Sequence, residues 1–114
     1  MPAAGPSMSD DISKYLYDAL EAVQAIELFT AGVTYSMYLQ HEMIQTAVER
    51  KFEVIGEALH RVERVNTGIF EQIPHASRIV GFRNILAHGY DVIDQEIVWD
   101  IVRHHLLPLK AKLQ

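Results

Sequence analysis

The stretch "IQTAVERKFEVIGEALHRV", residues 44–62, carries the clearest structural pattern in the chain. Its apolar side chains recur every three or four residues, which places them on one side of an α-helix. The members of this stripe are Ile44, Val48, Phe52, Ile55, Leu59 and Val62. Charged residues fill much of the remaining surface, and we interpret them as a solvated face. The pattern predicts a long amphipathic helix, and Gly56 within it offers a place where another helix can approach closely.

Three further helices are predicted around this stretch. The first covers residues 9–31, and the long helix itself is expected to run from a cap at position 34 or 36 to about position 65. A third helix is expected to begin at Pro74 and to end at about Ala87. Asp94 can cap a fourth helix, which Pro108 interrupts before a last short helical turn. Short connections between four helices predict an all-α, up-and-down four-helix bundle with additional short turns.

The composition limits the class of protein. With 114 residues the chain forms one domain, for which we expect a flexible tail over residues 1–8 and a single helical domain over residues 9–114. There is no cysteine, so there is no disulfide and no thiolate site, and we expect a cytoplasmic protein. No apolar run has the length of a membrane span and no signal-peptide pattern is present, so we expect no membrane partner.

The charge of the chain is unevenly distributed. The formal net charge is -5, which argues against broad electrostatic binding of nucleic acid. However, no acidic residue occurs between Glu71 and Asp91. The cationic or titratable residues of this window are His75, Arg78, Arg83 and His88. An anion can therefore be accepted there although the whole chain is acidic.

Arg83 has an unusual position in the segment "GFRNILAHGYD", residues 81–91. On a helix with Ile79 set at zero, Leu86 falls at about 340° and Arg83 at about 40°, inside the apolar arc. A guanidinium group is costly to bury without a partner. Arg83 can therefore extend along the core edge into water, pair with a carboxylate such as Glu57, or point into a cleft at a subunit interface. The periodicity alone favours the first two alternatives.

The remaining polar residues carry weaker signals. His88 lies at a predicted helix C-terminus, where the helix dipole favours its protonated form, and alone it would be interpreted as a capping residue. The six histidines show no H-E-x-x-H or comparable metal-binding spacing, and no glycine-rich phosphate loop occurs. We therefore predict no metal and no cofactor. Aromatic side chains that can stack on nucleic-acid bases are Trp99, Tyr15, Tyr17, Tyr35 and Tyr38, and core or interface packing is the favoured interpretation of them.

The residues Arg83-Asn84-x-x-x-His88-x-Tyr90 resemble the R-x-x-x-x-H-x-Y motif of the HEPN superfamily, and the resemblance is closest to its HepT-like branch. It extends over most of the chain, including "VIGEALHRV" (residues 54–62) and "IVWDIVRHHLLPLK" (residues 97–110). The resemblance implies a HEPN-type four-helix bundle and a homodimer in which both copies of the motif face one cleft. Catalytic members are metal-independent endoribonucleases, so it also implies an RNA substrate.

The resemblance assigns a role to each motif residue. Arg83 would bind the phosphate and His88 would act as general acid and base, with Asn84 orienting either His88 or the phosphate. Tyr90 would position RNA, and it matches the tyrosine to which a partner nucleotidyltransferase transfers AMP. The chain would then be the toxin of a type VII toxin–antitoxin system with a minimal nucleotidyltransferase as its antitoxin. Glu57 is the candidate partner of Arg83.

Two alternatives to a nuclease remain open on the sequence. One is a catalytically silent HEPN domain that binds a nucleotidyltransferase or a nucleotide. The other is a structural helical protein in which Arg83 forms only a salt bridge and His88 only a helix cap.

Overall fold

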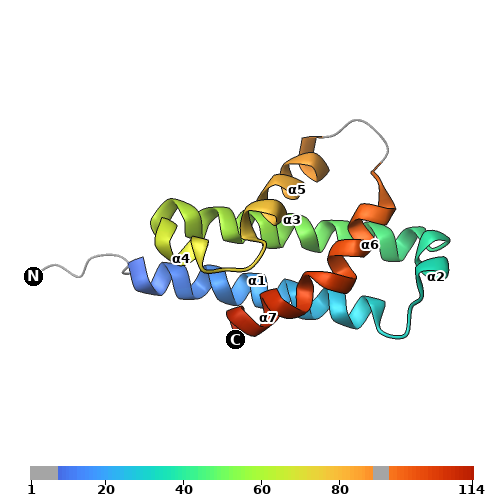
Figure 1. Ribbon diagram of the computed structural model, residues 1–114, viewed down its shortest axis with the longest axis horizontal. Helices are drawn as coiled ribbons and strands as arrows, with labels where there is room; N and C mark the ends of the chain where they lie inside the picture. Colours follow the sequence, from blue (N-terminus) through green and yellow to red (C-terminus); the bar gives the residue numbers. More distant parts are fainter. Residues whose placement is uncertain (1–7, 89–92) are drawn as a thin grey trace, which may run out of the picture.

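The computed structural model describes residues 8–88 and 93–114, and all regular secondary structure in these ranges is helical. Two long helices, α1 (Met8–Thr30) and α3 (Glu42–Val65), run antiparallel along the length of the molecule (Figure 1). The predicted stripe of α3 faces α1 and is largely buried, with Val48, Phe52 and Leu59 fully shielded from solvent. The predicted all-α, HEPN-type bundle is therefore confirmed.

The prediction of one helix from position 34 or 36 to position 65 was wrong at its N-terminal end. A short helix, α2 (Tyr35–Leu39), precedes α3, and each has its own cap. Thr34 Oγ1 accepts a hydrogen bond from the backbone N–H of Met37 at 3.1 Å, and His41 Nδ1 accepts one from Ile44 at 3.3 Å. These side chains satisfy amide groups that would otherwise lack partners, so the chain can turn between the two helices.

The connection between α3 and the motif-bearing helix also contains a short helix, α4 (Thr67–Glu71). Asn66 Oδ1 accepts a hydrogen bond from the backbone N–H of Ile69 at 3.0 Å and so caps α4. The next helix, α5 (Ala76–His88), begins two residues after the proline that was predicted to start it. The reason is His75, whose φ of 61° lies in the left-handed region and breaks the helical path.

The C-terminal part of the chain forms two helices, α6 (Gln95–His104) and α7 (Leu106–Leu113). Asp94 caps α6 as predicted, with its Oδ1 accepting from the backbone N–H of Glu96 at 3.0 Å. The predicted interruption at Pro108 falls instead at His105. Pro108 lies in the first turn of α7, where an amide would have no helical partner, so its missing N–H costs no hydrogen bond.

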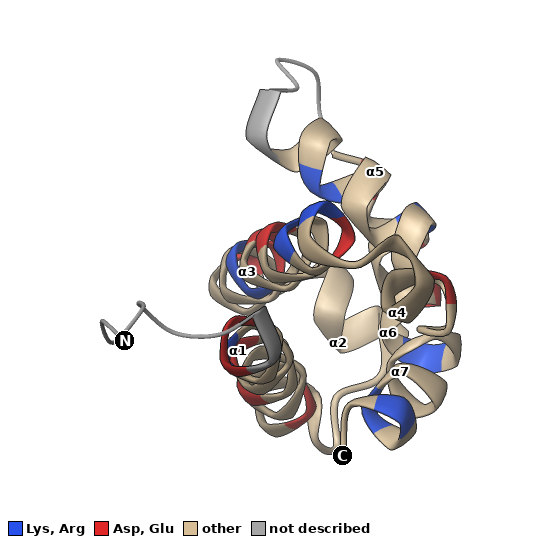
Figure 2. Cartoon of the chain, turned by 90° about the vertical axis from the view of Figure 1, so that its left-hand side faces the viewer, with Lys and Arg blue, Asp and Glu red and all other residues tan. Residues whose placement is uncertain are grey.

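The arrangement of the helices leaves α5 supported mainly from one side. Its principal contact is with α3, and from there it leads away from the two long helices (Figures 1 and 2). Helix α6 crosses the bundle near α2, where the buried Tyr38 hydroxyl donates to Gln95 Oε1 at 2.6 Å. Gln95 Nε2 in turn donates to Glu49 Oε2 at 2.6 Å, which connects α6 to α3. The position of α5 therefore depends chiefly on its contact with α3.

None of the helices in the described part of the chain is both long and apolar enough to cross a membrane.

Candidate functional site

Helix α5 approaches α3 closely at Gly56. A Cβ atom added there would lie 2.2 Å from Arg83 Cβ and 3.3 Å from the Ile79 carbonyl oxygen, so no larger residue fits without movement. Beside this contact, the Phe52 and Phe82 rings meet edge to face, with centroids 5.7 Å apart and planes at 71°. The aliphatic part of Arg83 is thus pressed against α3, which explains why this arginine lies within an apolar arc.

The guanidinium group of Arg83 reaches Glu57, the residue that follows Gly56. Arg83 Nη2 donates to Glu57 Oε2, and the two side chains are 27% and 36% exposed. Because both groups are only partly accessible to water, the opposite charge compensates for much of the solvation that each has lost. Arg83 therefore pairs with a carboxylate from another helix, which was one of the three alternatives open on the sequence.

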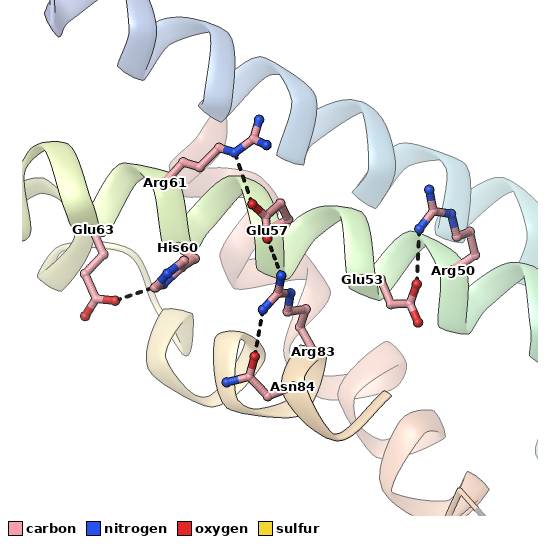
Figure 3. Close-up of polar contacts among 8 residues, drawn as sticks. All are labelled: Arg50, Glu53, Glu57, His60, Arg61, Glu63, Arg83 and Asn84. Atoms are coloured by element: carbon pink, nitrogen blue, oxygen red, sulfur yellow. Dashed lines mark hydrogen bonds and ion pairs between the residues drawn. The ribbon is translucent and has the colours of Figure 1, made fainter. Parts of the chain in front are cut away.

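Asn84 holds the second terminal nitrogen of Arg83. Its Oδ1 accepts from Arg83 Nη1 at 2.7 Å, so the asparagine contacts the residue immediately before it (Figure 3). A guanidinium group has five N–H donors, and these contacts use two of them. The remaining donors leave Arg83 able to bind a further acceptor while Glu57 and Asn84 keep it in place.

A second arginine shares the Glu57 carboxylate. Arg61 Nε donates to Glu57 Oε1 at 3.1 Å, so Glu57 lies between two guanidinium groups (Figure 3). The Arg61 guanidinium carbon also lies 5.9 Å from the centroid of the Tyr15 ring on α1. Arg61 is one of the charged residues of the long helix that were predicted to form a solvated face, and its side chain is 54% exposed. The i, i+4 spacing of Glu57 and Arg61 was the signal that could have identified this contact.

The other two motif residues, His88 and Tyr90, have no described side chain. His88 is the last residue of α5, one turn after Asn84 along the helix, and its side chain lies outside the part that the structure describes. Tyr90 lies in the segment 89–92, also outside the described residues. The structure therefore brings together Arg83, Asn84 and Glu57, and the roles of His88 and Tyr90 stay predictions.

The histidines whose side chains are described make local contacts within the bundle. His60 Nδ1 lies 3.6 Å from Glu63 Oε1 and His104 Nε2 lies 3.8 Å from Asp100 Oδ1. No group of three or more His, Asp or Glu side chains suited to hold a metal ion occurs among the described residues.

Known proteins that resemble this chain agree in their names. The family model for ribonuclease HepT-like proteins matches residues 19–114. "Putative RNase MJ1380" of Methanocaldococcus jannaschii is 34% identical over 104 residues, which cover 91% of this chain and 94% of the relative. "Probable ribonuclease HepT" of Thermococcus cleftensis is 31% identical over 100 residues, which cover 88% of this chain and 90% of the relative. No solved structure is significantly similar. The chain therefore belongs to the HepT-like ribonuclease family.

Proposed function

We propose that this protein is a metal-independent endoribonuclease that cleaves RNA in a cleft between two copies of the chain. The observation that supports the proposal most strongly is the way in which the Arg83 guanidinium group is held. Its guanidinium group is held by Glu57 and Asn84, is partly exposed, and keeps donors for another ligand. An RNA phosphate offers paired acceptor oxygens that match this planar group.

The chemistry assigned to the motif is an internal transfer of the phosphate. The ribose 2′-hydroxyl oxygen forms a bond to the adjacent phosphorus, and the bond from phosphorus to the 5′ oxygen breaks. His88 removes the proton from the 2′-hydroxyl group or delivers a proton to the leaving 5′ oxygen, because imidazole titrates near neutral pH. Arg83 stabilises the negative charge that develops on the phosphate. The products are a 2′,3′-cyclic phosphate and a 5′-hydroxyl end.

A cleavage assay in the presence of a chelator tests this proposal. We expect His88→Ala to reduce the cleavage rate about 100-fold or more, since it removes the proposed acid–base group. Arg83→Gln should also reduce the rate, because it removes the charge on the phosphate. Arg50→Gln is the control, since Arg50 lies on α3, away from the motif, and like Arg83 it is paired with a glutamate: its Nη1 lies 3.1 Å from Glu53 Oε2. Equal rates for His88→Ala and Arg50→Gln would contradict the assignment, and RNA binding without cleavage by the wild type would indicate a silent binding domain.

The proposal includes control by covalent modification. A cognate minimal nucleotidyltransferase would transfer AMP from ATP to the Tyr90 hydroxyl and release pyrophosphate, so that the chain and its partner form a type VII toxin–antitoxin pair. The added phosphate would compete with RNA for Arg83. Incubation with ATP and the partner should add the mass of one AMP group to the wild type and none to Tyr90→Phe. Addition of AMP to the Tyr90→Phe variant as well as to the wild type would show that another residue is the acceptor.

A homodimer is the proposed active form. Sedimentation equilibrium at the concentration of the cleavage assay should give the mass of two chains. A single-chain mass under conditions of full activity would contradict a cleft shared between two copies.

A further inference from the structure

The Arg61 side chain is held in place although most of it is exposed. Its Nε donates to Glu57 at 3.1 Å, and its guanidinium carbon lies 5.9 Å from the Tyr15 ring centroid. The two terminal nitrogens of Arg61 have no partner in the described part of the chain. The side chain therefore presents a planar pair of donors whose orientation is set by its neighbours, which reduces the entropy lost when an anion binds.

A pocket opens beside this arginine. It has a volume of about 390 Å³ and is lined by Tyr15 of α1 and by Arg61, Arg64 and Val65 of α3. Arg61 and Arg64 are three residues apart and so lie on neighbouring positions of one helix face. Among its described lining residues there are two cations, one aromatic ring and one aliphatic side chain, and there is no carboxylate. This lining is suited to an anion that carries an apolar or aromatic group.

The pocket adjoins the Arg83 site through one side chain. Glu57 accepts from Arg61 through Oε1 and from Arg83 through Oε2, so the two guanidinium groups lie on either side of one carboxylate (Figure 3). A linear ligand that carries anions at regular intervals could therefore contact Arg83 and Arg61 at the same time. Single-stranded RNA has this character, because each nucleotide contributes one phosphate and one base.

We propose that the pocket of Tyr15, Arg61 and Arg64 binds the RNA nucleotide next to the one whose phosphate Arg83 holds. Arg61 and Arg64 bind the neighbouring phosphate, and the Tyr15 ring packs on the base. This inference rests on the proposed ribonuclease function and extends it with a binding site for uncleaved RNA. It also explains how a chain with a net charge of -5 can bind a polyanion, because Arg61, Arg64 and Arg83 place three cations around the single carboxylate of Glu57.

Binding measurements in a His88→Ala background test the proposal without cleavage of the RNA. The probe is a fluorescently labelled, unstructured single-stranded RNA of about 12 nucleotides, which is enough to cover a short binding groove. Arg61→Gln and Arg64→Gln should each raise the dissociation constant several-fold. The logarithm of the association constant falls linearly with the logarithm of the salt concentration. Each substitution should make this slope less negative by about 0.7, the value for one phosphate contact on a single strand. The control Arg50→Gln should change neither quantity. Identical results for Arg61→Gln and Arg50→Gln would overturn the proposal.

Substitutions of Tyr15 test whether the pocket recognises a nucleotide or attracts any polyanion. Tyr15→Leu should weaken binding of the RNA about fivefold or more, since a stacked base is lost, whereas Tyr15→Phe should retain the affinity. Neither change should affect binding of inorganic polyphosphate. Equal weakening for RNA and polyphosphate would show a site for phosphate alone and would contradict the role of Tyr15.

These outcomes distinguish the binding site from the nuclease. Cleavage by the wild type together with no effect of Arg61→Gln on RNA binding would overturn the binding site and leave the nuclease. An effect of Arg61→Gln on RNA binding without cleavage by the wild type would support the binding site and overturn the nuclease. Thermal unfolding should show little change for Arg61→Gln, because its pair with Glu57 joins two partly exposed side chains of one helix.

Discussion

Two polar clusters near α5 differ in charge: one includes Arg83 of this helix, and the other lies just before its first residue. In the first, Arg83 and Arg61 share the carboxylate of Glu57, so two cations are paired with an opposite charge. In the second, the rings of His75 and His105 stack before the start of α5, with centroids 4.1 Å apart and planes at 9°. His105 is 8% exposed, and its Nδ1 has no hydrogen-bond partner among the described residues.

The environment of His105 opposes protonation. Burial lowers the pKa of His105, and the nearby His75, Arg78 and His104 lower it further, while Asp100 acts in the opposite direction. Helix α5 therefore contributes Arg83 to an ionised cluster with α3, and just before its first residue lies a buried histidine whose environment disfavours protonation. Only the ionised cluster is suited to bind a charged substrate.

The largest expected effect comes from pushing α5 away from α3. Gly56→Ala should lower the free energy of unfolding by about 1–3 kcal/mol, because its Cβ would overlap with Arg83 Cβ. Alanine is otherwise the better helix former, so the loss must come from the contact with α5. Thermal or urea unfolding measures the difference.

Gly81→Ala is the matched control on α5, since a Cβ there meets no atom within 4 Å. It should raise the free energy of unfolding by about 0.4–1 kcal/mol through the lower entropy of the unfolded chain. A stabilising effect of both substitutions would show that α5 can shift on α3 at no cost, and the close approach at Gly56 would then not fix Arg83.

The buried His105 should make stability depend on pH. Since the pKa of His105 is lowered in the folded state, the unfolded chain binds more protons as the pH falls below about 6.5. The stability that this neutral histidine contributes is fully present at neutral pH. It is then lost on acidification by at most about 1.4 kcal/mol per pH unit, until the folded state is also protonated.

His105→Phe keeps a ring beside His75 and removes the titrating group. The free energy of unfolding, measured by urea titration from pH 7.5 to pH 5, should fall less steeply in this variant than in the wild type. Parallel curves for the two proteins would show that His105 is not held neutral, and the contrast between the clusters would disappear.

The smallest expected effect is the removal of charge from Glu57. Glu57→Gln retains an acceptor for Arg83 and Arg61 but loses the ion pairs, and we expect a loss of about 1 kcal/mol or less because the side chains are partly exposed. Glu53→Gln, which removes a more exposed pair with Arg50 on α3, should cost less than Glu57→Gln. Equal losses from Glu57→Gln and Glu53→Gln in urea unfolding would mean that the contact between α3 and α5 adds nothing to an ordinary surface pair.

Some boundaries of the helices could not be predicted because they depend on side-chain hydrogen bonds and backbone conformations that the apolar periodicity does not reveal. The periodicity of α3 is visible in the sequence, but the turn before it is not. There, Gln45 Nε2 donates to the carbonyl groups of Tyr38 and Leu39 at 2.9 and 3.1 Å, which stabilises a turn within an otherwise helical pattern. The left-handed backbone of His75 likewise had no decisive local signal, since only a few per cent of residues other than glycine adopt this conformation.

The sequence by itself determined the class of fold, the helix that carries the motif, and the family, because periodicity, caps and short motifs depend on residues close together in the chain. It also placed Arg83 inside an apolar arc without deciding what the arginine contacts. The sequence named Glu57 as a candidate partner, but only the tertiary structure decided for it, because α5 meets α3 at Gly56, where the missing Cβ lets the helices approach. Pairing across helices depends on packing geometry, and packing geometry is not encoded in any single stretch of the chain.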